Sequence, residues 1–205
     1  TWLRNHKDAE LYIQNYTIFR SDRVRPKKRR GRNSGGTAIY IRDDLAASTD
    51  ILLEHSNGVV ETLCVYIKSI NLIICLTYRQ PNDPKGGNYS TAKEFNESLQ
   101  KLTAVIEKLP SPTPNIILAG DFNLPKTNWP QGTAKSGATP DERDMIELLS
   151  KFTTQHFLSQ QILEQTHEAG NTLDLIFTNN TDIIHSYTVT PTKPVSPHYL
   201  VSCTN

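Results

Sequence analysis

The chain has 205 residues and a formal net charge of +1 at pH 7. This length fits one sizeable domain with a two-layer core. The small net charge identifies no partner. No apolar run approaches the roughly 20 residues that a membrane helix needs, which excludes a helix that spans a membrane.

Apolar and β-branched residues predict the first strands. The segment from Thr37 to Ile41 has the β-branched and aromatic enrichment of a strand. Two further apolar runs, Glu61 to Ile67 and Leu72 to Tyr78, are separated by Lys68 to Asn71, which predicts an antiparallel hairpin. Because these runs are continuously apolar, we expect both faces of the hairpin to be covered.

Two helices are predicted from periodicity and start signals. From Thr91 to Leu109 apolar residues recur at steps of three and four, and Thr91 with Glu94 forms a capping box. A second helix opens at Thr139, with Pro140 in its first turn and Glu142 completing a capping box. A helix followed by a strand, after several strands, favours helices stacked outside paired sheets over an all-β sandwich.

The most informative stretch lies where the apolar run from Asn115 to Gly120 ends. Asp121 and Asn123 follow it, and on an extended backbone both side chains leave the same face. A carboxylate can hold Mg²⁺ or accept a proton from water, and a carboxamide can donate to a phosphate oxygen. The alternative is a simple β-turn, because Asn and Asp cap their own backbone in turns.

Two other features carry information about burial and charge. Asp174 lies within the apolar run Leu173 to Thr178, where a carboxylate is costly unless it is paired. The segment Arg23 to Arg32 holds seven basic residues in ten positions. Three interpretations of this segment stay open: a solvated, mobile loop, a surface that contacts phosphates, and a nuclear-import signal.

The three cysteines are odd in number and far apart. Cys64 and Cys75 lie in apolar, strand-like runs, and Cys203 lies near the end of the sequence. This distribution predicts buried free thiols in a reducing compartment rather than disulfides or a zinc site.

Several motifs together resemble a known superfamily. The segment GDFN from Gly120 to Asn123, with Leu124-Pro125 and Trp129 after it, resembles the signature of the endonuclease/exonuclease/phosphatase superfamily in the version carried by LINE-type (non-LTR) retrotransposons. Further matching segments follow the same order: SGGTAIYI from 34 to 41, LTYRQP from 76 to 81, NTLDLIFTN from 171 to 179 and SPHYLV from 196 to 201. The resemblance covers nearly the whole chain. It implies an α/β fold, a four-layer α/β/β/α sandwich of two facing mixed sheets, here with its first strand missing.

The resemblance also implies a catalytic site. Asp121 would orient the attacking water or bind a Mg²⁺ (or Mn²⁺) ion, and Asp174 would accept a hydrogen bond from a catalytic His198. Asn123 and Tyr78 would hold phosphate oxygens, although Tyr78 is equally explained by packing at a strand end. Arg29 and Arg30 are candidates for holding the flanking DNA backbone.

The chain departs from the family pattern at two places. Thr1-Trp2-Leu3 resembles a segment whose preceding Glu binds the metal, so that this Glu and a phosphate-contacting Asn on an earlier strand would lie outside the sequence. Pro197 stands where the family has an Asp, and proline supplies neither a charge nor a backbone donor. Both departures predict a weakened or inactive site.

The function expected from the resemblance is Mg²⁺-dependent nicking of a DNA duplex by the endonuclease domain of a non-LTR retrotransposon polyprotein. Residues 1–205 would be a fragment of that single domain, with a reverse transcriptase domain downstream. The protein would be intracellular and would act in the nucleus. Two alternatives stay open: a decayed relic that binds nucleic acid without cutting it, which Pro197 favours, and a phosphatase of the same superfamily.

Overall fold

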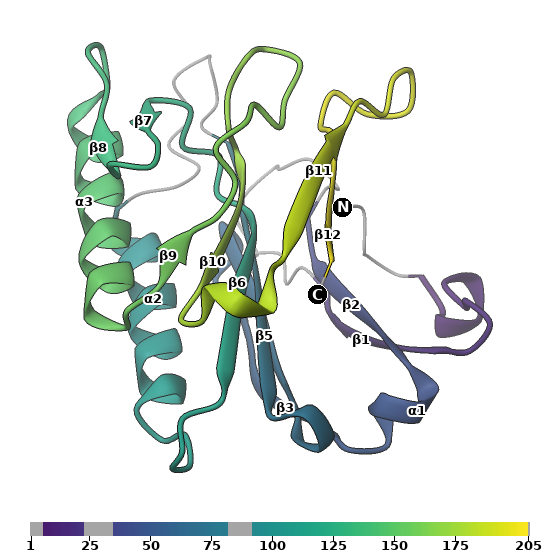
Figure 1. The fold of residues 1–205 in the computed structure, drawn as a ribbon. Helices are drawn as coiled ribbons and strands as arrows, with labels where there is room; N and C mark the ends of the chain where they lie inside the picture. Colours follow the sequence, from purple (N-terminus) through teal and green to yellow (C-terminus); the bar gives the residue numbers. More distant parts are fainter. Residues whose placement is uncertain (1–5, 23–34, 82–91, 205) are drawn as a thin grey trace.

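The computed structural model describes residues 6–22, 35–81 and 92–204, and its centre is a six-stranded mixed sheet (Figure 1). The strand order is β3-β4-β5-β6-β10-β9, and only β5 and β6 run parallel to each other. The strands are β3 (Thr49–Ser56), β4 (Val60–Ile67), β5 (Leu72–Arg79), β6 (Asn115–Asp121), β9 (Ser159–Gln160) and β10 (Asp174–Thr178).

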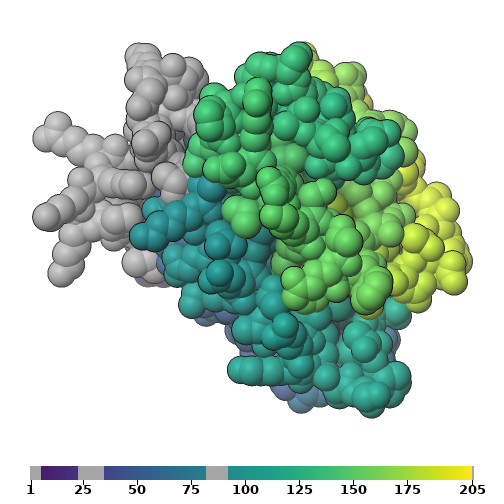
Figure 2. All heavy atoms as spheres, turned by 90° about the vertical axis from the view of Figure 1, so that its left-hand side faces the viewer, coloured from purple at the N-terminus to yellow at the C-terminus, as the bar shows by residue number. Residues whose placement is uncertain are grey.

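Helices cover one face of this sheet and strand pairs cover the other (Figure 1). The helices are α2 (Ala92–Ile106) and α3 (Pro140–Gln155), and Figure 2 shows the molecule from their side. The strand pairs are β1 (Tyr16–Ser21) with β2 (Thr37–Arg42), and β11 (Ser186–Thr190) with β12 (Leu200–Thr204). The smaller elements are α1 (Asp43–Ala46), the pair β7 (Thr127–Asn128) and β8 (Thr133–Ala134), and three 3-10 turns, η1 (Asp8–Glu10), η2 (Lys68–Ile70) and η3 (Thr181–Ile183).

The central hairpin of β4 and β5 is buried on both faces, as its continuous apolarity predicts. Alternate residues of β4 enter two separate cores: Cys64 packs with the helices, whereas Leu63 and Val65 pack with Ile39 and Ile41 of β2. The sheet therefore separates two apolar layers, and the expected α/β arrangement of facing sheets with helices outside is confirmed.

The start signal predicted for the second helix is present in the structure. Thr139 caps α3: its Oγ1 accepts a hydrogen bond from the Glu142 N–H, and the Glu142 side chain accepts from the Thr139 N–H. The capping box at Thr91 lies outside the described residues. Among the helices of the described ranges, none combines the length and apolarity that crossing a membrane would require.

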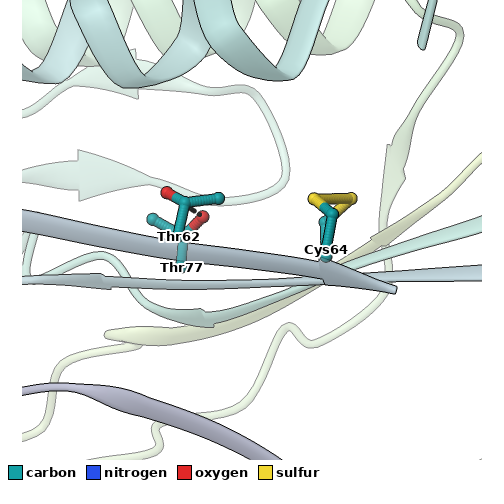
Figure 3. Close-up of a disulfide and its surroundings, with 4 residues drawn as sticks. Thr62, Cys64 and Thr77 are labelled. Carbon is teal, nitrogen blue, oxygen red and sulfur yellow. Dashed lines mark hydrogen bonds between the residues drawn. A yellow bond between two sulfur atoms is a disulfide. The ribbon is translucent and has the colours of Figure 1, made fainter. Parts of the chain in front are cut away.

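The prediction of free thiols is wrong for two of the three cysteines. Cys64 and Cys75 face each other across β4 and β5, with Cα atoms 4.1 Å apart, and form a disulfide on the helix side of the sheet (Figure 3). Thr62 and Thr77 form the neighbouring pair on the same side of the sheet, with their hydroxyls in contact. Cys203 is free and exposed.

A single glycine allows β6 to lie against β5 next to the predicted site. Gly120 has a φ of +144°, and a Cβ atom placed on it would lie 1.8 Å from the carbonyl oxygen of Thr77. A side chain at this position would both strain the backbone and push the two strands apart. Gly120 thus determines how closely Asp121, the next residue, approaches β5.

We predict that Gly120→Ala lowers the free energy of unfolding by about 2 to 5 kcal/mol, from backbone strain and steric overlap together. Gly137→Ala is the matched control. Gly137 also has a positive φ, +79°, but a Cβ atom there would meet nothing within 4 Å. It should lose only the strain contribution, about 1 to 2 kcal/mol. Urea denaturation measures the free energy of unfolding of both variants. Equal losses in Gly120→Ala and Gly137→Ala would contradict the close approach of Gly120 to Thr77.

Candidate active site

Three polar side chains occupy adjacent positions on three neighbouring strands. Asp121 pairs with Asp174 across β6 and β10, and Tyr78 pairs with Asp121 across β5 and β6. Directly paired residues of a sheet project from the same face. Since Leu76 of β5 packs toward the strand-pair side, Tyr78 and its partners project to that side as well.

His198 lies between the two carboxylates. Its Nδ1 is 2.9 Å from Oδ2 of Asp174, and its Nε2 is 3.8 Å from Oδ2 of Asp121. The predicted imidazole–carboxylate partnership is therefore present, although 24 residues separate the partners in sequence.

The backbone around His198 is held by a short bridge to the segment before β10. His198 pairs with His167, the Tyr199 N–H donates to the Thr166 carbonyl at 2.7 Å, and the Glu168 N–H donates to the Pro197 carbonyl at 2.9 Å. The bridge uses the carbonyl of residue 197 and not its N–H, so proline fits this position. Pro197 does not supply the carboxylate that the family resemblance predicts at this position.

Thr166 is a structural residue that the sequence analysis missed. Its side chain is fully buried, and its Oγ1 accepts hydrogen bonds from the backbone N–H groups of Leu173 and Asp174, both at 3.0 Å. It therefore fixes the first residue of β10 while its own carbonyl holds the backbone of Tyr199. The only sequence signal was a threonine shortly before the turn at Gly170, and its burial is visible only in the structure.

Asn123 reaches Asp121 by a different geometry from the one expected. The strand ends at Asp121, and Asn123 has a left-handed φ of +49°, so the prediction of a continuous extended backbone is wrong here. Its N–H donates to Oδ1 of Asp121 at 3.1 Å, and its Nδ2 donates to Oδ2 at 2.7 Å and to the Arg79 carbonyl at 2.8 Å. Both hydrogens of the amide are thus directed at protein acceptors, one of them the Asp121 carboxylate.

These residues line one cavity of about 420 Å³. All five described residues that the sequence analysis assigned to the site contribute to its wall: Tyr78, Asp121, Asn123, Asp174 and His198. Arg29 and Arg30 lie outside the described residues. The wall also includes Ser196, whose Oγ accepts a hydrogen bond from the His198 N–H at 3.0 Å.

The electrostatics of the cavity favour bound protons. Burial raises the pKa of Asp121 to about 7, and repulsion from Asp174 adds to this effect, while attraction to His198 and the hydrogen bonds from Asn123 oppose it. The hydrogen bond to Asp174 raises the pKa of His198, and burial opposes it. At neutral pH the site therefore combines a carboxyl group close to its midpoint with an imidazole biased toward its charged form.

The same cluster has donors for a metal ion. One ligand atom each from Asp121, Asp174 and His198 lie within 4.8 Å of one another. Oδ2 of Asp174 is already bonded to His198, which leaves Asp121 as the main carboxylate for a hard cation. Mg²⁺ is commonly held by only one or two carboxylates together with waters and substrate phosphates, so the donor chemistry fits.

Comparison with known proteins identifies the family. Residues 72–202 match the model of a family described as endonuclease-reverse transcriptase. The chain belongs to this family. All five site residues fall within the matched endonuclease-reverse transcriptase region, which covers more than half of the sequence. No match was found among curated proteins.

Solved structures share the fold at low sequence identity. The endonuclease domain of TRAS1, a telomere-specific non-LTR retrotransposon, has a TM-score of 0.56 and 16% identity over 92% of this chain and 77% of its own. The AP endonuclease LMAP from Leishmania major has a TM-score of 0.61 and 11% identity over 96% and 73% of the two chains. An endonuclease/exonuclease/phosphatase family protein from Bacteroides thetaiotaomicron has a TM-score of 0.52 and 14% identity over 96% and 75%. At these identities the matches establish the fold.

The raised pKa values predict how stability depends on pH in the metal-free protein. The folded chain binds protons at Asp121 and His198 more tightly than the unfolded chain does. Their contribution is therefore present below the ordinary pKa values and is lost as the pH rises through the raised ones. Between pH 5.5 and pH 8 we expect Asp121 alone to lower the free energy of unfolding by about 2 kcal/mol.

Urea denaturation of the wild type and of Asp121→Asn at these two pH values measures this effect. The Asn variant should lose most of the pH dependence. Asp182→Asn, at an exposed carboxyl outside the cavity, should keep it. The same pH dependence in all three proteins would show that Asp121 is not the group responsible.

Proposed function

We propose that this chain is the DNA-nicking endonuclease domain of a non-LTR retrotransposon polyprotein and that it hydrolyses a phosphodiester with the help of Mg²⁺ or Mn²⁺. The observation that carries the proposal is the contact of His198 with Asp174 beside the Asp121 carboxylate, in one cavity of about 420 Å³. A hydrogen-bonded acid and imidazole next to a second acid is an arrangement suited to general acid–base work on a phosphate ester.

Each site residue has a separate role in the proposed hydrolysis. Water attacks the phosphorus, the bond to O3′ breaks, and the leaving O3′ takes a proton from solvent. The products are a 3′-hydroxyl, suited to priming reverse transcription, and a 5′-phosphate. Asp121 orients the water and accepts its proton. The imidazolium of His198, held by Asp174, stabilises the negative charge on the phosphoryl oxygens. Tyr78, at the cavity wall, donates its phenolic hydrogen to one of them.

The proposed metal site centres on Asp121. A bound Mg²⁺ would neutralise charge on the phosphate as the bond to the leaving oxygen breaks. Asn123 orients Asp121, because its backbone N–H donates to Oδ1 and its side-chain Nδ2 donates to Oδ2. The phosphate contact expected from the sequence would require one of the two hydrogen bonds of Nδ2 to be exchanged, so we assign Asn123 to orienting Asp121.

The substrate that fits is duplex DNA. We place Arg29 and Arg30 on the flanking phosphates, a reverse transcriptase domain downstream in the same polyprotein, and the site of action in the nucleus. The family description, endonuclease-reverse transcriptase, and the fold shared with the TRAS1 domain support the DNA substrate and the downstream reverse transcriptase. The assignment of Arg29 and Arg30 follows from the basic charge of their segment.

A second candidate function is binding of nucleic acid without cleavage. Pro197 favours it, because the loop position next to His198 carries no carboxylate. The two candidates predict different behaviour when a carboxylate is placed there.

Nicking of supercoiled plasmid in Mg²⁺ separates them. We expect little nicking by the wild type and an increase of about 10²-fold or more in Pro197→Asp, the size typical of one acidic or electrostatic group. Pro197→Ala is the matched control, since it removes the ring without adding a charge, and it should stay slow. Adding Asp121→Ala to Pro197→Asp should abolish the gain. Failure of Pro197→Asp to nick in a protein that also carries the upstream Glu-bearing segment expected from the resemblance would contradict the endonuclease. Persistence of the gain without Asp121 would contradict the site.

A further inference from the structure

Arg79 is a fully buried cation directly behind the proposed active site. It is 1% exposed and is the last residue of β5, immediately after Tyr78. Successive strand residues project from opposite faces, so Arg79 points away from the cavity that Tyr78 lines. Its cross-strand partner is Val60, which belongs to the core on the helix side. Arg79 therefore cannot touch a substrate in the cavity.

The guanidinium instead binds the turn that follows Asp121. Its Nε donates to the Phe122 carbonyl at 2.7 Å, and a terminal nitrogen donates to the Asn123 carbonyl. Asn123 returns a bond from Nδ2 to the Arg79 carbonyl at 2.8 Å. Two successive carbonyls thus converge on one planar fork of donors, in a turn whose second residue is left-handed.

This set of bonds, which we call the Arg79 clamp, has a direct connection to the catalytic carboxylate. The residue held by the clamp, Asn123, is the one that donates to both oxygens of Asp121. If the turn relaxed, Asn123 would leave its left-handed conformation, and both donors would move away from Asp121.

The positive charge also acts on the site. Neutral donors would satisfy two carbonyls, whereas burying a cation is costly unless an anion compensates it. Burial lowers the pKa of Arg79 to about 10, so it stays charged, and attraction to the Asp121 carboxylate is the main opposing influence. This attraction favours the charged form of Arg79, while burial and Asp174 still hold the pKa of Asp121 above its ordinary value.

We propose that Arg79 is a positioning residue of the active site, which acts through Asn123 to hold the Asp121 carboxylate in its working orientation. The catalytic role of Arg79 rests on the proposed function. Its role in holding Asn123 and Asp121 can be tested without measuring catalysis. The alternative is that Arg79 only contributes to folding.

The deciding measurement is amide hydrogen exchange in the wild type, Arg79→Lys and Arg79→Gln. Lys keeps the charge without the fork, and Gln keeps a neutral donor. Both should lower Tm and raise the exchange rate of the Asn123 amide, which is bonded to Asp121, at least tenfold. The Asp174 amide, bonded to Thr166, should keep its protection.

Thr178→Val is the matched destabilised control. Thr178 is 1% exposed at the other end of β10, and its hydroxyl is bonded to Asn180. This variant should lower Tm without selective exchange at Asn123. A general rise in exchange in the Arg79 variants, or failure of both to fold, would overturn the proposal, because Arg79 would then serve the whole fold and not the site.

Kinetics add a readout that distinguishes this inference from the proposed function. In the Pro197→Asp background, Arg79→Lys should lower kcat for nicking about 100-fold, as expected for a misplaced catalytic group. The Kd for a duplex of about 20 base pairs should change less than threefold, because a buried residue makes no DNA contact. Equal kcat in Arg79→Lys and Thr178→Val would overturn the positioning role. Absence of nicking in a Pro197→Asp parent that carries the upstream Glu-bearing segment would overturn the proposed function, while the exchange data would still decide the role of Arg79.

Discussion

The antiparallel pairing of β6 with β10 is the constraint on which the candidate site depends. It places Asp121 opposite Asp174 at the position where β6 ends and β10 begins. Because side chains alternate between the faces of a strand, a slip of one residue would turn Asp174 toward the helices. His198 would then lose its partner. Thr166 protects this register, since one hydroxyl holds the N–H groups of both Leu173 and Asp174.

Two groups of opposite charge lie on the two sides of the turn from Asp121 to Asn123. The Asp121 carboxylate faces the cavity, and the Arg79 guanidinium lies on the helix side, with Asn123 between them. Burial opposes the charged form of both groups, because it raises one pKa and lowers the other. Burying both charges is costly in stability. We attribute their presence here to the proposed orientation of Asp121.

Much of this arrangement could be predicted from the sequence. The features that could not be predicted depend on contacts between distant residues. The motif resemblance brought Asp121, Asp174 and His198 together, although nothing in their spacing does so. The disulfide was predictable from the hairpin, because the loop Lys68 to Asn71 pairs Ile67 with Leu72 and hence Cys64 with Cys75. The left-handed Asn123 agrees with the β-turn alternative, because Asn tolerates this conformation and its N–H is bonded to the Asp121 side chain. The contact with the distant Arg79 was not predictable from local pattern.

The account depends most directly on the bond between His198 and Asp174, and an NMR titration of the His198 ring tests it. In the wild type the pKa of His198 should lie above the ordinary 6.5, and in Asp174→Asn it should fall, because the hydrogen bond to the carboxylate is the largest cause of the increase. His156, which lies outside the cavity and whose pKa burial lowers, should keep the same pKa in both proteins. A pKa of His198 that is the same with and without Asp174 would contradict the site described here.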